Sequence, residues 1–405
     1  MITRTAFLAL IAAVAALAVG LFVAELEGDA VISDTPVYRY YGERIVSGDV
    51  PYRDFRVEYP PGALIPFVVP ALISSSPHGF DASFEALMVI GLIAAAVLIV
   101  LSLVALGGST LEILLSVAAF LAGVALLGPF VLTRFDLYAA TLTLAALCAI
   151  LRRRRTLGPV LLGIAIATKI YPAVLLPLLV ARTWRRDGRP AALTALGLSI
   201  GTSLLIYLPF AVVAPEGVVR SVWRQLGRPL QIESMGSGVL LAFHHAAGMP
   251  LGWASGSGSQ NLTGTVATVA SAVTTVVGAA ALLLVWVRFA RGDAGCDARF
   301  VRYTAAAVVA FVAFGKVVSP QFLVWLLAIV VLVRGARGTA AIALLLIACV
   351  LTRAWFPSDY WDLVKQFDPT ASWLVLARDL VLVAVFAALV VRGGRRIRAR
   401  EPAAA

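Results

Sequence analysis

Asp34 is the residue of this chain whose type and position point most directly to chemistry. It belongs to a Ser-Asp-Thr-Pro helix-start signal, and Gly48 supplies a stop signal, which together predict a short helix. Val37, Tyr41 and Ile45 recur along it at i, i+4 and i+8, so we expect it to lie in a membrane interface with its tyrosines at headgroup depth. Asp34 can cap this helix. It can also stay ionised near the helix N-terminus and accept a proton from a hydroxyl as a general base.

The elements that must position Asp34 are transmembrane helices. The 405 residues are 61% hydrophobic and only 14% charged, with a mean hydropathy of +0.94. This composition excludes a soluble enzyme, a disordered chain and a nucleic-acid-binding domain. Apolar runs of about 20 residues recur from end to end, which is the pattern of an all-α polytopic membrane protein.

Thirteen apolar runs are candidate spans, and the first is read as an uncleaved anchor rather than a signal peptide. Basic loops at both ends of the chain require an even number of crossings. The run at 60–75 is short and carries four prolines, so it is predicted to be a partial or re-entrant helix. About 12 transmembrane helices then remain, at residues 5–24, 84–106, 109–128, 131–151, 157–168, 170–181, 190–213, 264–288, 301–316, 320–334, 338–353 and 371–391.

The basic residues gather in short clusters between these runs, which predicts which loops face the cytoplasm. The segments predicted to be cytoplasmic hold 20 of the 33 Lys and Arg but only 5 of the 22 Asp and Glu. Both chain ends are expected inside. The clusters lie at residues 152–155, 182–189, 288–302, 334–337 and 392–400.

Two long segments, 25–60 and 214–262, are then expected on the outer face, and such loops suit an enzyme that works at the membrane surface. We expect Gly252–Ser259 to be a flexible patch within the second. The three cysteines are far apart and predict neither a disulfide nor a metal site.

Five blocks of sequence carry a resemblance to a known family. Asp34 is followed by Gly-Asp-Val-Pro-Tyr-Arg-Asp-Phe-Arg-Val-Glu-Tyr-Pro-Pro at 48–61. Together these resemble the first-loop signature of GT-C superfamily glycosyltransferases. The chain is similar to the actinobacterial polyprenyl-phosphate-mannose-dependent α-mannosyltransferases of the family eighty-seven type. Four further blocks match in the same order, at 133–137 (TRFDL), 163–172 (GIAIATKIYP), 228–234 (RPLQIES) and 315–321 (GKVVSPQ).

The resemblance implies a single GT-C-like membrane domain over 1–405 and an inverting glycosyltransferase. Its donor would be a sugar, mannosyl or similar, linked through phosphate to a polyprenol, and its acceptor a lipid or glycan. In that family an acidic residue soon after the first span is the catalytic base, a position that Asp34 occupies. Cations must stabilise the leaving phosphate, and an apolar groove must hold the prenyl chain.

The candidate residues follow from these needs. Lys169, Lys316, Arg228 and Arg134 are the candidate donor-phosphate ligands. For Lys169 the alternative is an interfacial lysine that snorkels. For Arg134 it is an ion pair with Asp136, and for Arg228 a solvated loop. The candidate sugar- or acceptor-binding residues are Asp54, Glu58, Gln231, Glu233, His244 and Gln321.

A transporter or flippase of a lipid-linked sugar is the competing interpretation, because it needs the same groove and cations. It predicts inverted repeats and broken helices at the midplane, which the sequence does not display convincingly apart from the hairpin at 157–181. The long acidic first loop favours the enzyme. No cofactor is expected. An acidic loop can recruit a divalent ion, but no Asp-x-Asp cluster supports one. The site is expected on the outer face of the cytoplasmic membrane.

Overall fold

The computed structural model describes residues 3–26 and 32–391, so the basic tail at 392–400 lies outside the described residues. Within these ranges the chain is mostly helical, which confirms the prediction of an all-α polytopic membrane protein. Seven helices are long and apolar enough to cross a membrane. They are α1 (Arg4–Glu25), α4 (Pro77–Ala105), α5 (Thr110–Leu127), α9 (Arg189–Val213), α12 (Thr265–Ala290), α15 (Ala336–Arg353) and α17 (Pro369–Val390).

The other predicted spans form shorter helices, and this difference creates room for a site. A bilayer core is about 30 Å thick, whereas the 12 residues of α7 rise only about 18 Å. Several helices therefore end inside the bundle rather than at its surface. The short elements are η1 (Pro61–Leu64), α3 (Ile65–Ile73), η2 (Pro129–Val131), α6 (Asp136–Leu151), α7 (Leu157–Thr168), η3 (Tyr171–Leu175), α8 (Leu176–Asp187), α13 (Asp297–Ala313) and α14 (Phe322–Val330).

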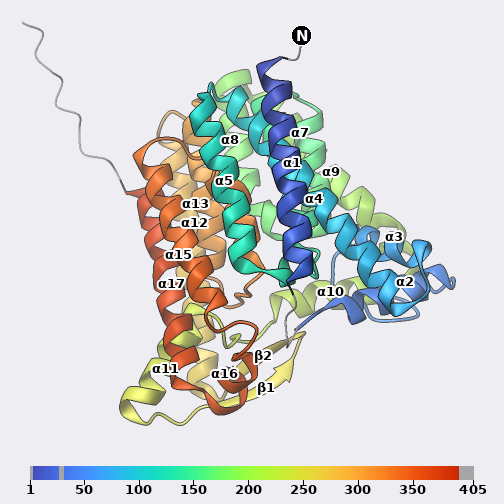
Figure 1. Ribbon diagram of the computed structural model, residues 1–405, viewed down its shortest axis with the longest axis vertical. Coiled ribbons are helices and arrows are strands. Elements are labelled where there is room, and N and C mark those ends of the chain that lie inside the picture. The colour runs from blue at the N-terminus through green and yellow to red at the C-terminus, as the bar shows by residue number, and fades with distance from the viewer. Residues whose placement is uncertain (1–2, 27–31, 392–405) are drawn as a thin grey trace, which may run out of the picture.

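The segments expected on one side of the membrane collect at one end of the bundle, opposite the start of α1 (Figure 1). Helix α10 runs across this end, roughly perpendicular to the long helices. These elements are α2 (Thr35–Val46), α10 (Pro215–Leu226), α11 (Met235–Ala247), β1 (Gly252–Gly256), β2 (Ser259–Thr263) and α16 (Tyr360–Gln366).

The loops expected in the cytoplasm meet at the opposite end. The Arg334 guanidinium pairs with Glu112 at 3.0 Å, although the two lie 222 positions apart. Arg155 pairs with Asp187 at 2.6 Å. The grouping of loops that the charge pattern predicts is therefore the grouping in the structure.

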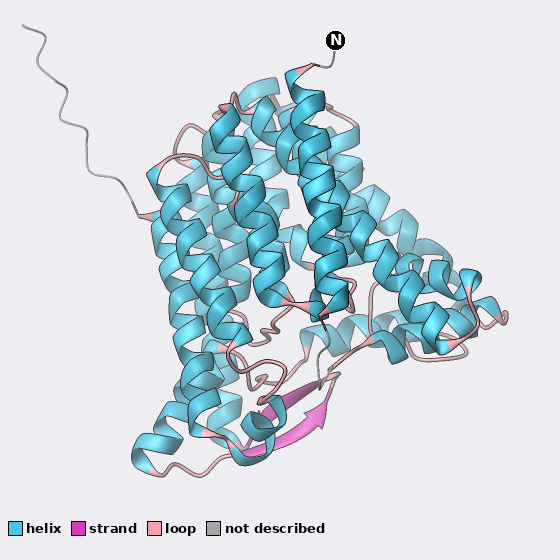
Figure 2. Ribbon diagram, viewed as in Figure 1, coloured by secondary structure: helices cyan, strands magenta, loops and turns pink. Residues whose placement is uncertain are grey.

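The Gly252–Ser259 patch is not an irregular flexible segment. Its residues form an antiparallel hairpin in which Gly252 pairs with Thr263 and Gly256 with Ser259 (Figure 2). Ser257 and Gly258 at the turn both have positive φ angles, which Gly adopts readily. Gly258 thus closes a tight turn, while Gly252 and Gly256 are paired in strand β1.

The predicted apolar face of α2 is wrong in part. Val37 is 44% exposed, whereas Tyr38, its neighbour, is fully buried. The Tyr38 ring stacks on Phe67 of α3 at 4.4 Å and contacts Phe84 of α4 at 5.3 Å. Helix α2 packs onto two protein helices, so the buried stripe is set by those neighbours rather than by a membrane surface.

Candidate active site

A cavity of about 600 Å³ opens among the ends of the short helices. Its walls come from the start of α2, the residues before α6, the turn after α7 and the loops at 228–234 and 315–321. We call it the main cavity. Nine of the predicted site residues line it, namely Asp34, Glu58, Arg134, Lys169, Arg228, Gln231, Glu233, Lys316 and Gln321.

Asp34 does not cap helix α2. It stands at the N-cap position but makes no side-chain cap bond, and the Ser33 hydroxyl accepts from the Thr35 N–H instead. The Asp34 carboxylate points to the cavity, where the Tyr38 hydroxyl donates to Oδ2 at 3.2 Å. Burial raises the pKa of Tyr38 well above its usual value, so its hydroxyl remains a neutral donor.

Arg134 does not pair with Asp136, as one interpretation of the sequence proposed. Its Nη1 donates to Oδ2 of Asp34, and its Nη2 donates to the Ile32 carbonyl at 2.9 Å. The Arg134 side chain is only 8% exposed. Both side-chain bonds to Asp34 therefore end on Oδ2, and Oδ1 has no hydrogen-bond partner among the described residues.

Lys169 lies inside the bundle and does not snorkel. Because α7 ends at Thr168, the next residue is held at cavity depth rather than at the membrane surface. Its Nζ donates to Asp136 Oδ1 at 2.6 Å, and the same oxygen accepts from Trp325 Nε1 at 2.9 Å. Asp136, which is 1% exposed, is the buried counter-ion of Lys169.

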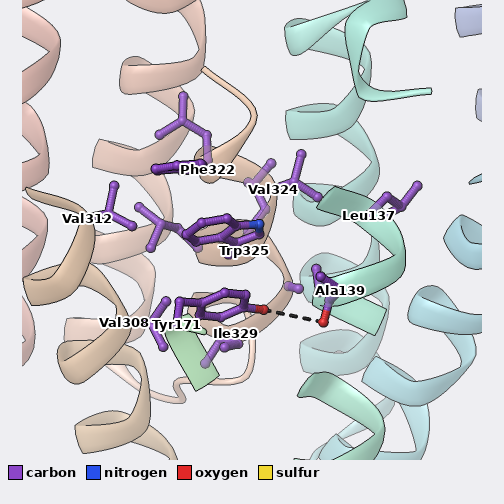
Figure 3. Close-up of a cluster of buried hydrophobic side chains, with 14 of the residues drawn as sticks. Leu137, Ala139, Tyr171, Val308, Val312, Phe322, Val324, Trp325 and Ile329 are labelled. Carbon is purple, nitrogen blue, oxygen red and sulfur yellow. Dashed lines mark hydrogen bonds between the residues drawn. The ribbon is translucent and has the colours of Figure 1, made fainter. Parts of the chain in front are cut away.

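Aromatic rings form the floor beneath this ion pair. Tyr171, Trp325 and Phe322 stack in one column, with ring centroids 4.1 and 4.0 Å apart (Figure 3). Lys169 Nζ lies 4.3 Å from the Phe135 ring centroid and 5.0 Å from that of Trp325. Rings on several sides compensate the ammonium for lost hydration through cation–π attraction.

Two further cations face the main cavity with few protein partners. Arg228 makes no ion pair with the described residues, and its Nε is buried without a hydrogen bond. Burial lowers the pKa of Arg228, which reflects the cost of holding a cation there. Lys316 Nζ donates to the Leu226 carbonyl at 3.0 Å and is partly exposed.

Gln231, Glu233 and Ser319 make a compact group that we call the polar wall. Gln231 Nε2 donates to Glu233 Oε2 and, at 3.0 Å, to Ser319 Oγ. Gln231 is 3% and Glu233 2% exposed, yet Oε1 of each is buried without a hydrogen bond. Unpaired buried oxygens that border a cavity are suited to hydrogen-bond a polar ligand.

Glu58 lies where the first loop meets α10. Its carboxylate contacts Arg224 at 3.4 Å, and Gln225 Nε2 donates to its backbone carbonyl at 2.7 Å. Gln321 lines the cavity at the N-cap of α14. Glu58 and Gln321 both line the main cavity, although they come from distant parts of the chain.

Apolar side chains form another part of the wall. They come from α12 and α13, and from Tyr207 on α9. Helices α9 and α12 bury little of their own surface within the described protein, so their apolar faces are available to lipid. The apolar lining residues of α12 and of the end of α13 are Ala279, Leu282, Phe311 and Phe314.

Asp54 and His244 lie outside the main cavity. Asp54 pairs with Arg53 at 2.9 Å and accepts from the Val50 N–H, beside a shallow groove on the other side of α2. His244 Nδ1 lies 2.6 Å from the Met249 carbonyl, and its ring packs on Phe367. Both side chains are therefore held by neighbours away from the predicted site.

Sequence reasoning missed Tyr38, Trp325 and Ser319 as site residues. A tyrosine four positions after an N-cap aspartate is a weak signal, because many tyrosines occupy interfaces. Among the described residues, no group of three or more His, Cys, Asp or Glu is placed to hold a metal ion.

The fold and the cavity define a class of protein. A helical membrane bundle carries, at one end, a carboxylate and several cations beside an apolar wall, as expected of a GT-C membrane glycosyltransferase. Residues 58–320 match the model of Glycosyltransferase family 87, and the chain belongs to this family.

The structure is also similar to the crystal structure of ArnT from Cupriavidus metallidurans bound to undecaprenyl phosphate. The TM-score is 0.53 at 14% sequence identity, and the match covers 96% of this chain and 77% of that chain. At this identity the likeness establishes the GT-C fold alone. No curated protein matches the sequence.

Proposed function

We propose that this membrane glycosyltransferase takes its sugar from a polyprenyl-phosphate donor and transfers it, with inversion, to an acceptor hydroxyl. One observation carries the proposal: the main cavity combines a carboxylate with a free oxygen, four cationic side chains and an apolar wall. The undecaprenyl phosphate named for the ArnT crystal structure supports the same class of lipid.

In the proposed step the acceptor oxygen attacks the anomeric carbon of the donor sugar. The bond from that carbon to the phosphate oxygen breaks, and polyprenyl phosphate leaves. The acceptor proton passes to Oδ1 of Asp34, the oxygen without a hydrogen-bond partner. Arg134 and Tyr38 hold the carboxylate through Oδ2 and so fix the direction in which Oδ1 faces.

The cations act on the leaving group. Arg228 and Lys316 can contact the phosphate directly, because neither is neutralised by a carboxylate among the described residues. Lys169 keeps Asp136 as its counter-ion and contributes a weaker field. Cationic hydrogen-bond donors that are in place before the reaction stabilise the negative charge that develops on the leaving phosphate.

The substrates and the location complete the proposal. The resemblance of the first-loop segment to mannosyltransferases supports mannose, and a β-linked mannosyl donor would then give an α-mannoside. The acceptor is a lipid or glycan. The basic loops support an inner-membrane protein with cytoplasmic ends and a site on the outer face.

A transfer assay with the purified protein tests the proposal. Radiolabelled polyprenyl-phosphate mannose, polyprenyl-phosphate arabinose and the corresponding nucleotide sugars are each offered with lipid and glycan acceptors, with and without a chelator. We expect transfer from one polyprenyl-phosphate sugar and none from a nucleotide sugar. Transfer from nucleotide sugars alone would overturn the proposal.

The Asp34→Asn change tests the catalytic base. We expect kcat to fall by roughly 10² to 10⁴, the usual contribution of a positioned base, while donor affinity is retained. The matched control is Asp49→Asn, because Asp49 pairs with Arg44 in the same loop and does not line the main cavity. An equal loss in both variants would contradict the role of Asp34.

A further inference from the structure

Two charged residues that the proposed reaction does not use are buried next to each other on α17. Arg378 is fully buried and Asp379 is 1% exposed, and Arg378 Nε lies 2.7 Å from Asp379 Oδ1. Neither lines the main cavity. Buried charge in a membrane helix is costly, so its presence calls for a role.

Arg378 connects α17 to the site. Its Nη2 donates to the backbone carbonyl of Glu233 at 2.7 Å, across 145 positions of sequence. Glu233 belongs to the loop that carries the polar wall, between α10 and α11. This bond is the only hydrogen bond that the Arg378 side chain makes within the described part of the chain.

Side chains of the same loop line the main cavity. Gln231 and Glu233 are tied to each other, and Gln231 also binds Ser319. Their Oε1 atoms are the unpaired groups of the polar wall. Arg378 thus binds the backbone of a loop whose Gln231 and Glu233 side chains line the main cavity and carry unpaired oxygens.

We propose that Arg378, itself held by Asp379, is a positioning residue that fixes the Gln231–Glu233 segment so that its two unpaired oxygens bind hydroxyl groups of the donor sugar. The proposal rests on the proposed function. It assigns the positioning of the sugar-binding segment to a buried cation that itself touches no substrate. Arg228, in contrast, lines the cavity directly.

Arg378 donates to the backbone carbonyl of Glu233 and not to its side chain. Loss of this hydrogen bond therefore changes the position of the loop without removing any ligand-binding group. A glutamine at 378 is shorter and neutral and leaves Asp379 as an unpaired buried charge. A lysine keeps the charge and can donate from its single nitrogen, although it lacks the guanidinium geometry. Sugar binding should therefore fall strongly in Arg378→Gln and be largely kept in Arg378→Lys.

Two lipids separate sugar recognition from lipid binding. Dissociation constants are measured on the purified full-length protein for polyprenyl-phosphate mannose and for polyprenyl phosphate without sugar. For Arg378→Gln we expect donor affinity to fall about tenfold to hundredfold, the range of a lost charge-assisted hydrogen bond. Affinity for the sugar-free lipid should stay within about twofold of the wild type.

Arg182→Gln is the matched control. Arg182 is also a buried arginine paired with an aspartate, Asp297, but it lies at the opposite end of the bundle. We expect this variant to keep the wild-type ratio of the two affinities even if its thermal stability falls. Arg378→Lys supplies a folded second variant should the glutamine variant fail to fold, with a donor KM raised less than tenfold and kcat near wild type.

The outcomes are separable. A ratio unchanged in Arg378→Gln, or an equal loss of affinity for both lipids, would overturn the positioning role. Should the wild type bind neither lipid, the proposed function fails instead. Should it bind the sugar-free lipid but not polyprenyl-phosphate mannose, the sugar assignment of the polar wall fails.

Discussion

Both hydrogen bonds to the Asp34 side chain end on one oxygen, and this decides what the residue can do. Arg134 and Tyr38 contact Oδ2, whereas Oδ1 has no hydrogen-bond partner among the described residues. A carboxylate that caps a helix would use its oxygens on backbone N–H groups instead. At the residue scale, side chains of the site use one polar atom for hydrogen bonds within the protein and leave an oxygen unpaired. Gln231 and Glu233 likewise each have an Oε1 atom without a partner.

Glu233 predicts a pH dependence of donor binding. Burial raises the pKa of Glu233 to about 7, and the nearby Asp379 also raises this pKa. Arg378, Arg134 and the hydrogen bond from Gln231 act in the opposite direction and lower it. Below pH 7 the carboxyl is neutral, and above it the carboxylate repels the donor phosphate. We expect the donor KM to rise as pH increases through 7, by at most about tenfold per pH unit.

The Glu233→Gln variant is the check on this assignment. It keeps the size and one acceptor oxygen of Glu233 but cannot ionise. We expect its donor KM to be flat between pH 6 and 8, measured in the transfer assay. A rise that persists in this variant would mean that another group titrates.

Arg228 is predicted to bind the donor phosphate. The Arg228→Ala variant should raise the donor KM by about tenfold or more, because a charge-assisted bond to phosphate is lost. Arg220→Ala is the control, since Arg220 is exposed on α10 and does not line the cavity. Steady-state kinetics with varied donor gives both values, and equal KM for the two variants would be inconsistent with this role.

At the scale of elements, short helices make the site. Helix α7 stops after 12 residues, so Lys169 lies inside the bundle, and α14 spans only nine. The turns after α7 and before α14 are thereby brought beside the start of α6, where Arg134 and Asp136 lie. Full-length helices in their place would carry these residues to the membrane surface and fill the cavity with side chains.

Gly163 tests the position of α7. A Cβ at this residue would lie 2.4 Å from the Ser199 carbonyl of α9, so Gly163→Ala must push the two helices apart. We expect a loss of stability of about 1–3 kcal/mol, with reduced kcat because Lys169 shifts with α7. Thermal unfolding in detergent and the transfer assay measure both effects.

Gly201→Ala is the control on the neighbouring helix. Nothing lies within 4 Å of a Cβ built there, so the change should be neutral or stabilise α9 by up to about 1 kcal/mol. If Gly163→Ala behaved like Gly201→Ala, the close contact between α7 and α9 would not matter for the site.

At the scale of the whole molecule, charge is divided between the two ends of the bundle. Ion pairs such as Arg334 with Glu112 join the basic loops at one end. The first loop, α10, the hairpin and α16 gather at the other end (Figure 1), and residues from each of them line the main cavity. By the positive-inside rule we propose that the cavity end faces away from the cytoplasm.

Cysteine labelling tests this orientation. Cys296 is exposed at the basic end, whereas Cys148 and Cys349 are buried. We expect a membrane-impermeant maleimide to leave Cys296 unlabelled in right-side-out vesicles and to label it after permeabilisation. A cysteine introduced by Ser255→Cys, on exposed β1, should be labelled without permeabilisation. The reverse pattern would place the cavity toward the cytoplasm.

The sequence by itself determined the class of protein and the grouping of its loops, and most of the site residues that it predicted line the main cavity. Hydropathy and charge indicate whether each segment contacts lipid or water, and they are local properties of the sequence. Only the tertiary structure decided which side chains pair with one another. Arg134 pairs with Asp34 rather than Asp136, and Arg378 reaches Glu233, because contacts across 100 and 145 positions depend on where short helices end within the bundle.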